Sequence, residues 1–308
     1  MDVDATPDTS PEPMAVAAPI PEGDHPVIST TPPRTATAAS RSALAALIRR
    51  DLTVLRKNKF EFVGRTLIQP FLLVFVFLYV FPTIGQGVGS SGGRAGESAF
   101  ATILVPGVVG ISIMFQGIQA VAMVMAQEFG FTREIEDRVQ APCPIWLVAV
   151  AKVLSGAVQG VIAALIVFPM AYVIHANGVK VDLTVHWWIA VTLIPLFCIA
   201  MSSLGLVLGT KFEARNIGLM FGFVVLPVTF LGGTYYAWTA LSSVTVGSFH
   251  WLQTLVLVNP LIYVNEGMRA AFTTAPHMHL YVIYPVAIAF CALFLFEGVR
   301  GFRQRVLT

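Results

Sequence analysis

Long apolar stretches separated by short polar segments occupy most of the chain between Glu61 and Gly298. A helix needs roughly 20 apolar residues to cross a bilayer, because the hydrocarbon layer is about 30 Å thick and each residue rises about 1.5 Å. The stretches carry no Asp, Glu, Lys or Arg deep in their interiors, so the pattern predicts an all-α polytopic membrane protein. The six expected transmembrane helices are residues 61–81, 99–126, 145–175, 187–210, 216–236 and 280–298.

The composition indicates a membrane protein with little soluble structure. Hydrophobic residues make up 56% of the chain and charged residues 12%, whereas soluble domains contain about 25% charged residues. Residues 1–40 are acidic and rich in Pro, Ala and Thr, which predicts a disordered tail and does not fit a secretory signal. Residues 41–308 are then expected to form one transmembrane domain, and the three cysteines indicate no disulfide framework.

The basic residues predict the orientation in the membrane. With six crossings and the N-terminus in the cytoplasm, and leaving aside Arg34 in the N-terminal tail, 15 Lys and Arg residues fall on the cytoplasmic side and only Arg94, Lys180 and Arg269 fall outside. The excess of Lys and Arg in short cytoplasmic loops is the strongest determinant of topology. We therefore expect a multi-pass protein of the cell membrane with both termini in the cytoplasm.

The energy source for any transport is expected to lie outside this chain. Ion-coupled carriers place ionisable groups inside the membrane, and the expected spans have none deep in their interiors. No Lys follows a Gly, so the phosphate-binding pattern G-x-x-x-x-G-K-[ST] is absent from the sequence. We expect no catalytic, cofactor-binding or metal-binding residues. An ion-coupled carrier, with backbone carbonyls holding the ion, and a non-transport membrane scaffold are the alternatives.

An amphipathic helix is expected from Ala43 to Lys59, before the first span. Leucine and isoleucine recur there at intervals of three and four residues, and charged residues occupy the other positions. The basic residues are Arg49, Arg50, Arg56 and Lys57. Such a helix should lie flat on the cytoplasmic membrane surface, either as a simple anchor to anionic lipid or also as a docking face for a cytoplasmic partner.

The loop between the second and third spans carries dense charge of both signs. Thr132 can cap a short helix that Pro142 ends. Its charged residues are Arg133, Glu134, Glu136, Asp137 and Arg138. The loop is either a solvated connector or a projection that fits a cleft on another protein.

The segment from Gly232 to His279 is too apolar for a soluble loop. Its many aromatic residues fit two short re-entrant or interfacial helices on the outer side, broken near Gly247 and at Pro260. A seventh span, Ser248 to Tyr263, is the alternative, and it would place the Arg-rich C-terminus outside. Glu266 and Arg269 are three residues apart, so they can pair on one helical face.

Three pairs of glycines have the spacing that allows membrane helices to approach closely. They are Gly156/Gly160, Gly205/Gly209 and Gly218/Gly222. We expect all three pairs to pack inside one subunit.

Three motifs, in order along the chain, resemble those of ABC-2 type transport permeases. The run from Arg133 to Pro144, followed by Ala151-Lys152, is similar to the cytoplasmic loop of that family. Asn259-Pro260-Leu261-Ile262-Tyr263, with Arg269 after it, resembles the family's Asn-Pro-Leu-x-Tyr-x-x-x-x-x-Arg motif. Phe230 to Tyr236 resembles the stretch that ends the fifth span, although Ala237 and Trp238 stand where the family usually has Pro.

The resemblance implies a function and partners. Two permease chains, identical or homologous, would pair in the membrane above two copies of an ABC ATP-binding subunit, which bind ATP and Mg²⁺. Glu134 to Arg138 would form the coupling helix and Ala43 to Lys59 the gate or connecting helix. The outer motif of Asn259, Pro260, Tyr263, Glu266 and Arg269 would act as an outer gate or as a structural motif.

Among these permeases, the drug and lipid exporters similar to the daunorubicin-resistance type look closest. The cargo would then be a hydrophobic drug, a lipid or a glycolipid, with membrane lipid around the chain and no role for nucleic acid. A polysaccharide exporter is the nearer alternative, which aromatic rings lining a wider pore would favour.

Overall fold

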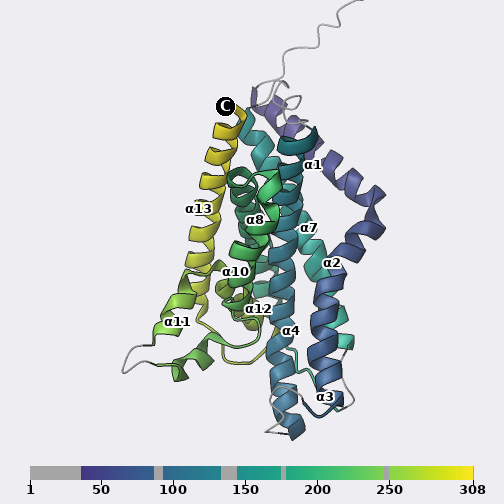
Figure 1. Cartoon of the computed structure of the whole chain (residues 1–308), viewed down its shortest axis with the longest axis vertical. Coiled ribbons are helices and arrows are strands. Elements are labelled where there is room, and N and C mark those ends of the chain that lie inside the picture. Colours follow the sequence, from purple (N-terminus) through teal and green to yellow (C-terminus); the bar gives the residue numbers. More distant parts are fainter. Residues whose placement is uncertain (1–35, 87–92, 133–143, 175–177, 246–249, 308) are drawn as a thin grey trace, which may run out of the picture. The chain divides into compact units, whose positions relative to one another are not determined.

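The computed structural model describes residues 36–86, 93–132, 144–174, 178–245 and 250–307. Within these ranges the chain forms helices and no strands, which confirms the all-α class (Figure 1). The longer helices are α1 (Ala36–Lys57), α2 (Lys59–Val74), α4 (Gly93–Ile118), α7 (Ile145–Val173), α8 (Trp187–Lys211), α12 (Pro260–Phe272) and α13 (Leu280–Leu307).

Five helical segments in the described ranges are long and apolar enough to cross a membrane. They correspond to the first four expected spans and to the last one. Their bounds are Lys59–Thr83, Ala95–Gly130, Ile145–Met170, Trp187–Lys211 and Leu280–Val306. Two of them continue past α2 and α4 through π-helical turns, η1 (Phe75–Val80) and η3 (Gln119–Met123).

The fifth expected span, 216–236, forms a shorter helix than the hydropathy pattern predicts. Helix is continuous only over Ile217–Phe230, through α9 (Ile217–Met220), η6 (Phe221–Val225) and α10 (Leu226–Phe230). Fourteen helical residues extend about 21 Å, less than the hydrocarbon thickness of about 30 Å. Gly233 adopts φ +70°, a left-handed conformation typical of residues just past a helix end, so the helix stops before this turn.

The segment after this turn contains two helical stretches. Trp251–Leu255 (α11) continues as a 3-10 turn to Val258, and the backbone leaves the helical conformation at Asn259 before α12 begins at Pro260. The continuous helix from 248 to 263 that a seventh span requires is therefore not formed over the described residues 250–263. The expected break near Gly247 lies outside the described residues.

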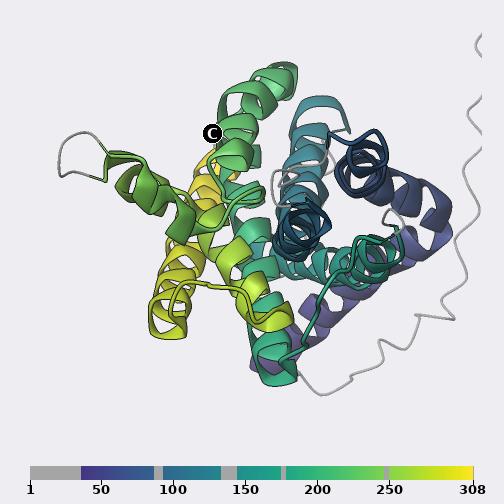
Figure 2. The same ribbon diagram turned by 90° about the horizontal axis from the view of Figure 1, so that it is seen from below.

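The helix before the first span begins at Ala36, inside the 1–40 segment that the sequence predicts to be disordered, and residues 1–35 lie outside the described ranges. Its leucines are half-buried, and Leu47 packs against the buried cluster that includes Val121, Val148 and Phe302. Figure 2 shows that α1 crosses the bundle helices instead of running parallel to them. The contacts of α1 are mainly with α7.

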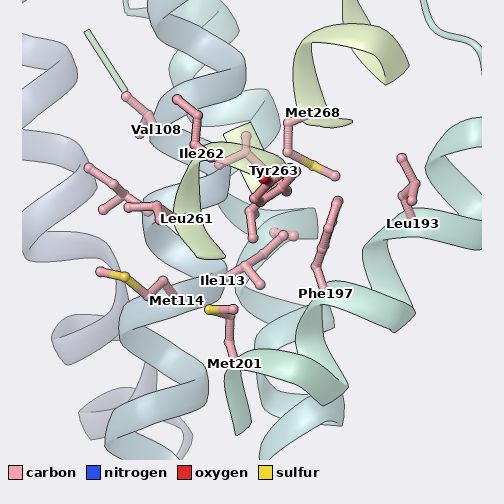
Figure 3. Packing of buried hydrophobic residues seen from close by; sticks show 14 of the residues in the cluster. Val108, Ile113, Met114, Leu193, Phe197, Met201, Leu261, Ile262, Tyr263 and Met268 are labelled. Carbon is pink, nitrogen blue, oxygen red and sulfur yellow. The ribbon is translucent and has the colours of Figure 1, made fainter. Parts of the chain in front are cut away.

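The core lies where α4, α8 and α12 meet (Figure 3). Every residue of α12 from Leu261 to Phe272 is buried, and its apolar side chains belong to the same buried cluster as Met114 of α4 and Phe197 of α8. A helix that is buried all round contributes to several interfaces at once. In this bundle α12 contacts α4, α8 and α13.

Two of the three glycine pairs pack inside the subunit as expected. A Cβ added at Gly160 would meet Cys198 of α8, and one added at Gly205 would lie 2.9 Å from the carbonyl oxygen of Gly117 on α4. The expectation is wrong for Gly218 and Gly222, which have no atom within 4 Å of an added Cβ. The segment that carries them lies at the surface of the bundle, where the described residues provide no neighbouring helix for this face.

One glycine outside these pairs controls how closely α4 and α12 approach. A Cβ at Gly110 would collide with the Asn265 side-chain oxygen, whereas one at Gly64 of α2 would meet nothing within 4 Å. We predict that Gly110→Ala lowers the melting temperature of the purified chain, because forcing one extra carbon into a packed core costs about 1–3 kcal/mol. The matched Gly64→Ala variant should melt at or slightly above the wild-type temperature. Equal melting of the two variants would contradict the close approach of α4 and α12.

Candidate functional site

A polar cluster surrounds α12, starting at its N-terminal cap. The Asn259 side-chain oxygen accepts a hydrogen bond from the backbone N–H of Leu261 at 2.9 Å, and Pro260 occupies the first turn. Both residue types favour a helix start. The Asn259 side-chain nitrogen also donates to the carbonyl of Val228 at 2.7 Å, so this cap fixes the helix start to α10.

Glu266 and Arg269 form the ion pair that their spacing predicts. The Arg269 Nη1 to Glu266 Oε1 distance is 2.8 Å, and both side chains are 0% exposed. Glu266 also accepts hydrogen bonds from the backbone N–H groups of Trp238 and Met278, each at 2.8 Å. Arg269 donates to the carbonyls of Gly233 and Tyr236. Through these hydrogen bonds the pair holds two other parts of the chain against α12: the segment Gly233–Trp238 and the backbone at Met278.

Asn265 completes this cluster. Its side-chain nitrogen donates to the Gly232 carbonyl at 2.7 Å and to the Thr234 hydroxyl at 3.0 Å. The Phe230–Tyr236 motif and the Asn259–Arg269 motif, separate in the sequence, thus form one interaction network. We call Asn265, Glu266, Arg269 and their backbone partners the Glu266 network. Tyr263 lies beside it and donates to the Leu257 carbonyl at 3.0 Å.

A second buried ion pair lies at the opposite ends of the long helices. Lys152 of α7 contacts Glu128, just after α5 (Val124–Gln127), at 2.7 Å, and each side chain is only 7% exposed. The pair lines a cavity of about 400 Å³ between α1, α2, α7 and the segment that continues α4. The charged residues lining this cavity are Arg50, Asp51, Glu61, Glu128 and Lys152. We call it the Lys152 cleft.

Polar side chains continue from the Lys152 cleft into the bundle. Ser155 is buried in the cleft wall and its hydroxyl has no hydrogen-bond partner in the described part of the chain. Gln159, also in the wall, accepts from the Gln116 side chain at 3.2 Å, and Gln116 accepts from the Thr66 hydroxyl at 3.0 Å. This row of polar groups connects α7, α4 and α2 within an otherwise apolar core.

The structure brings some of the residues singled out in the sequence together and leaves others apart. Asn259, Pro260, Tyr263, Glu266 and Arg269 all belong to α12 or its cap. On α1, the four basic residues are exposed, and Arg50 is the one among them that lines the Lys152 cleft. The residues of the expected coupling helix lie outside the described residues; they are Arg133, Glu134, Glu136, Asp137 and Arg138.

The Lys152–Glu128 pair is a feature that the sequence analysis missed. The available signal was Lys152 itself, the single charged residue of the expected span 145–175. A charged side chain within an apolar span almost always has a partner. Glu128 lies just beyond the end of the neighbouring expected span, 99–126, which made it the natural candidate for the ionic partner of Lys152.

The fold and these polar regions define a helical, multi-pass membrane protein with a charged cleft among its membrane helices. Residues 42–273 match the ABC-2 type transporter family. The chain is 26% identical over 250 residues to the inner membrane transport permease YadH of Escherichia coli strain K12, covering 78% of this chain and 90% of that protein. YadH of Shigella flexneri matches with the same identity and coverage.

The chain therefore belongs to the ABC-2 type transporter family. It is the membrane permease of an ABC transporter, and the family implies an ABC ATP-binding partner. Membrane subunits of this family are transport components and not ATPases. The family that the sequence motifs indicated is thereby confirmed.

The burial of the Glu266 network predicts a large effect of removing one charge. Glu266→Ala leaves Arg269 without its ionic partner, and breaking a buried pair in this way costs about 3–5 kcal/mol. We expect a clearly lower melting temperature and lower yield of folded protein. Glu213→Ala is the control, because Glu213 pairs with Arg215 at 2.6 Å in an exposed position and such surface pairs contribute at most about 1 kcal/mol. Indistinguishable melting of the two variants would show that the Glu266 network does not stabilise the fold.

Proposed function

We propose that this permease exports an amphiphilic or hydrophobic substrate, such as a drug, a lipid or a glycolipid, from the cytoplasm or inner leaflet. A separate ATPase subunit would drive the transport. The observation that supports this proposal is the Lys152 cleft, which places charged groups within a bundle whose outer surface is apolar. An amphiphile has the same two kinds of surface.

The size and position of the Lys152 cleft fit such a substrate. Its volume of about 400 Å³ lies in the range of small-molecule pockets, about 300–1,000 Å³. Phe62 of α2 and Asn58, just before this helix, line the cleft. On the same helix, Ile68 and Leu72 are 62% and 53% exposed. A polar group could bind in the cleft while the apolar part of the molecule stays against α2 and the surrounding lipid.

The distribution of basic residues supports the proposed orientation, with both termini in the cytoplasm. Figure 1 shows α1 and the C-terminal end of α13 at the same end of the bundle. Arg305 of α13 donates to the carbonyls of Gly209, Thr210 and Phe212, so the C-terminal end of α8 lies there too. We call this the basic end; it also carries Lys211, Arg300 and Arg303. The positive-inside rule would place it in the cytoplasm.

The surface of the short apolar helix supports a paired arrangement with a second permease, identical or homologous. Leu219, Phe223 and Phe230 are more than half exposed, and Gly218 and Gly222 are open to a neighbour. Small residues let membrane helices approach closely. A helix of a second permease could therefore pack on this face and complete the membrane unit.

ATP-driven motion would enter through the basic end. Two copies of the ATP-binding subunit, holding ATP and Mg²⁺, would bind the segment from Arg133 to Arg138 as a coupling helix. Six residues separate that segment from α7 in the sequence, and α7 carries Lys152 and contacts α1. Closure of the ATP-binding subunits would shift these helices and alternate the access of the cleft between the two sides of the membrane.

A double variant tests the role of the Lys152 cleft in export. Lys152→Met/Glu128→Gln removes both charges together, so no uncompensated buried charge remains. With the ATP-binding partner in proteoliposomes, wild type should move a fluorescent phospholipid or a lipophilic dye between leaflets when ATP is supplied. The variant should assemble normally but transport at least about tenfold more slowly, the equivalent of about 1.4 kcal/mol of lost recognition.

Three outcomes would count against the proposal. Unchanged transport by the double variant would show that the Lys152 cleft does not recognise the substrate. Transport of a lipid-linked glycan, with no movement of phospholipid or dye, would favour the polysaccharide exporter. Transport that persists without ATP and stops when the ion gradient is collapsed would identify an ion-coupled carrier.

Charge reversal in the loop tests the coupling to ATP. Glu134→Lys/Glu136→Lys should leave the chain inserted in the membrane, because substitutions at a water-facing surface usually change stability by under about 0.5 kcal/mol. The ATP-binding subunit should bind about a hundredfold more weakly, since inverting charges at a desolvated interface costs about 2–5 kcal/mol. Co-purification at matched expression measures this, with the exposed Glu213→Lys as control. Full recovery of the complex and of export would show that the loop is only a connector.

A further inference from the structure

A second cavity lies between α7 and α13 at the basic end of the bundle. It has a volume of about 900 Å³ and an apolar floor. Trp146 and Val150, one helical turn apart, form its wall on α7. On α13 the lining residues are Ala292, Leu295, Phe296, Val299, Arg300, Arg303 and Gln304.

The α13 residues that line this cavity all lie on one face of the helix, and along that face they change from apolar to basic. Its residues recur at intervals of three and four, which places them on one side of the helix. From Ala292 to Val299 this side is apolar over about 10 Å of helix, and Arg300 and Arg303 follow in the next turn. This cavity, which we call the groove, is therefore amphiphilic, with its positive charge at the end nearest the C-terminus.

The groove is open to the surroundings of the bundle. Trp146 and Phe296 are 49% and 64% exposed, so no described helix covers the floor. Arg300 and Arg303 are exposed as well, and neither makes an ion pair with any described residue. In a membrane the floor would face hydrocarbon and the two guanidinium groups would lie at the level where lipid headgroups begin.

We infer that this groove binds an anionic phospholipid of the bilayer. One acyl chain would lie along Leu295, Phe296 and Val150, and the phosphate would accept hydrogen bonds from Arg300 and Arg303. Guanidinium groups bind phosphate with charge-assisted, often bidentate hydrogen bonds. Basic pockets between membrane helices select acidic lipid headgroups for this reason. A phospholipid without net charge would fill the apolar floor but gain less from the basic rim.

This lipid site is independent of the proposed export function. The groove shares no lining residue with the Lys152 cleft, and α13 takes no part in lining that cleft. A lipid held here would be a resident partner of the permease and would be bound whether or not ATP is present.

Native mass spectrometry of the full-length purified chain can test the inference. The probes are phosphatidylglycerol and phosphatidylcholine with identical acyl chains, added in equal amounts. Wild type should retain phosphatidylglycerol preferentially. Arg300→Gln/Arg303→Gln should reduce that preference by about thirtyfold, because each basic residue near a membrane surface contributes a free energy equivalent to about a fivefold change in binding.

Two further variants separate the groove from general surface charge. Lys211→Gln/Arg215→Gln removes two exposed basic residues of the same end that do not line the groove, and it should leave the preference unchanged. Val150→Phe enlarges a side chain in the wall on α7, so it narrows the groove while keeping both arginines, and it should reduce phosphatidylglycerol binding at least severalfold. An equal loss in the two double variants, or full binding by Val150→Phe, would overturn the inference.

Discussion

The Glu266–Arg269 ion pair is the interaction on which the packing around α12 depends. Membrane helices surrounded by lipid have no water to solvate a charge or an unpaired backbone group, so every such group needs a partner within the protein. Arg269 and Glu266 meet this requirement for each other, and they also bond the backbone at Gly233, Tyr236, Trp238 and Met278. One pair of side chains thereby determines where the chain turns after α10 and where it enters α13.

The two buried ion pairs found among the described residues have different surroundings, and this difference indicates different roles. Around Glu266 most donors and acceptors are bonded, mainly to backbone groups, although the Asn265 side-chain oxygen and the Arg269 Nε have no hydrogen-bond partner among the described residues. Such dense bonding to the backbone is typical of a structural network. Lys152 and Glu128 instead border a cavity of about 400 Å³, next to Ser155, whose hydroxyl has no partner among the described residues. A polar cavity wall of this kind is suited to a ligand. The geometry therefore favours a structural role for the Asn259–Arg269 motif and a recognition role for the Lys152 cleft.

Two faces on the outer surface of the bundle also differ in the side chains that they expose. The face of Ile217–Phe230 offers glycines and large apolar side chains, which suit a second helix. The groove between α7 and α13 ends in two arginines, which suit an acidic lipid. These faces are both apolar on average, and hydropathy alone does not distinguish them. The position of small and basic residues on each face determines what can pack against it.

The amino-acid sequence by itself determined the class of the protein and the local features of its motifs. The thickness of a bilayer sets the length of an apolar helix, so five of the spans could be located from hydropathy. The pairing of Glu266 with Arg269 involves residues three apart on one helix, so their spacing was sufficient to predict it. The tertiary structure alone decided which distant groups these residues meet. The backbone partners of Glu266 and Arg269, the pairing of Lys152 with Glu128, and the contrast between Gly205 and Gly218 all depend on how the helices pack, and local sequence patterns do not encode that packing.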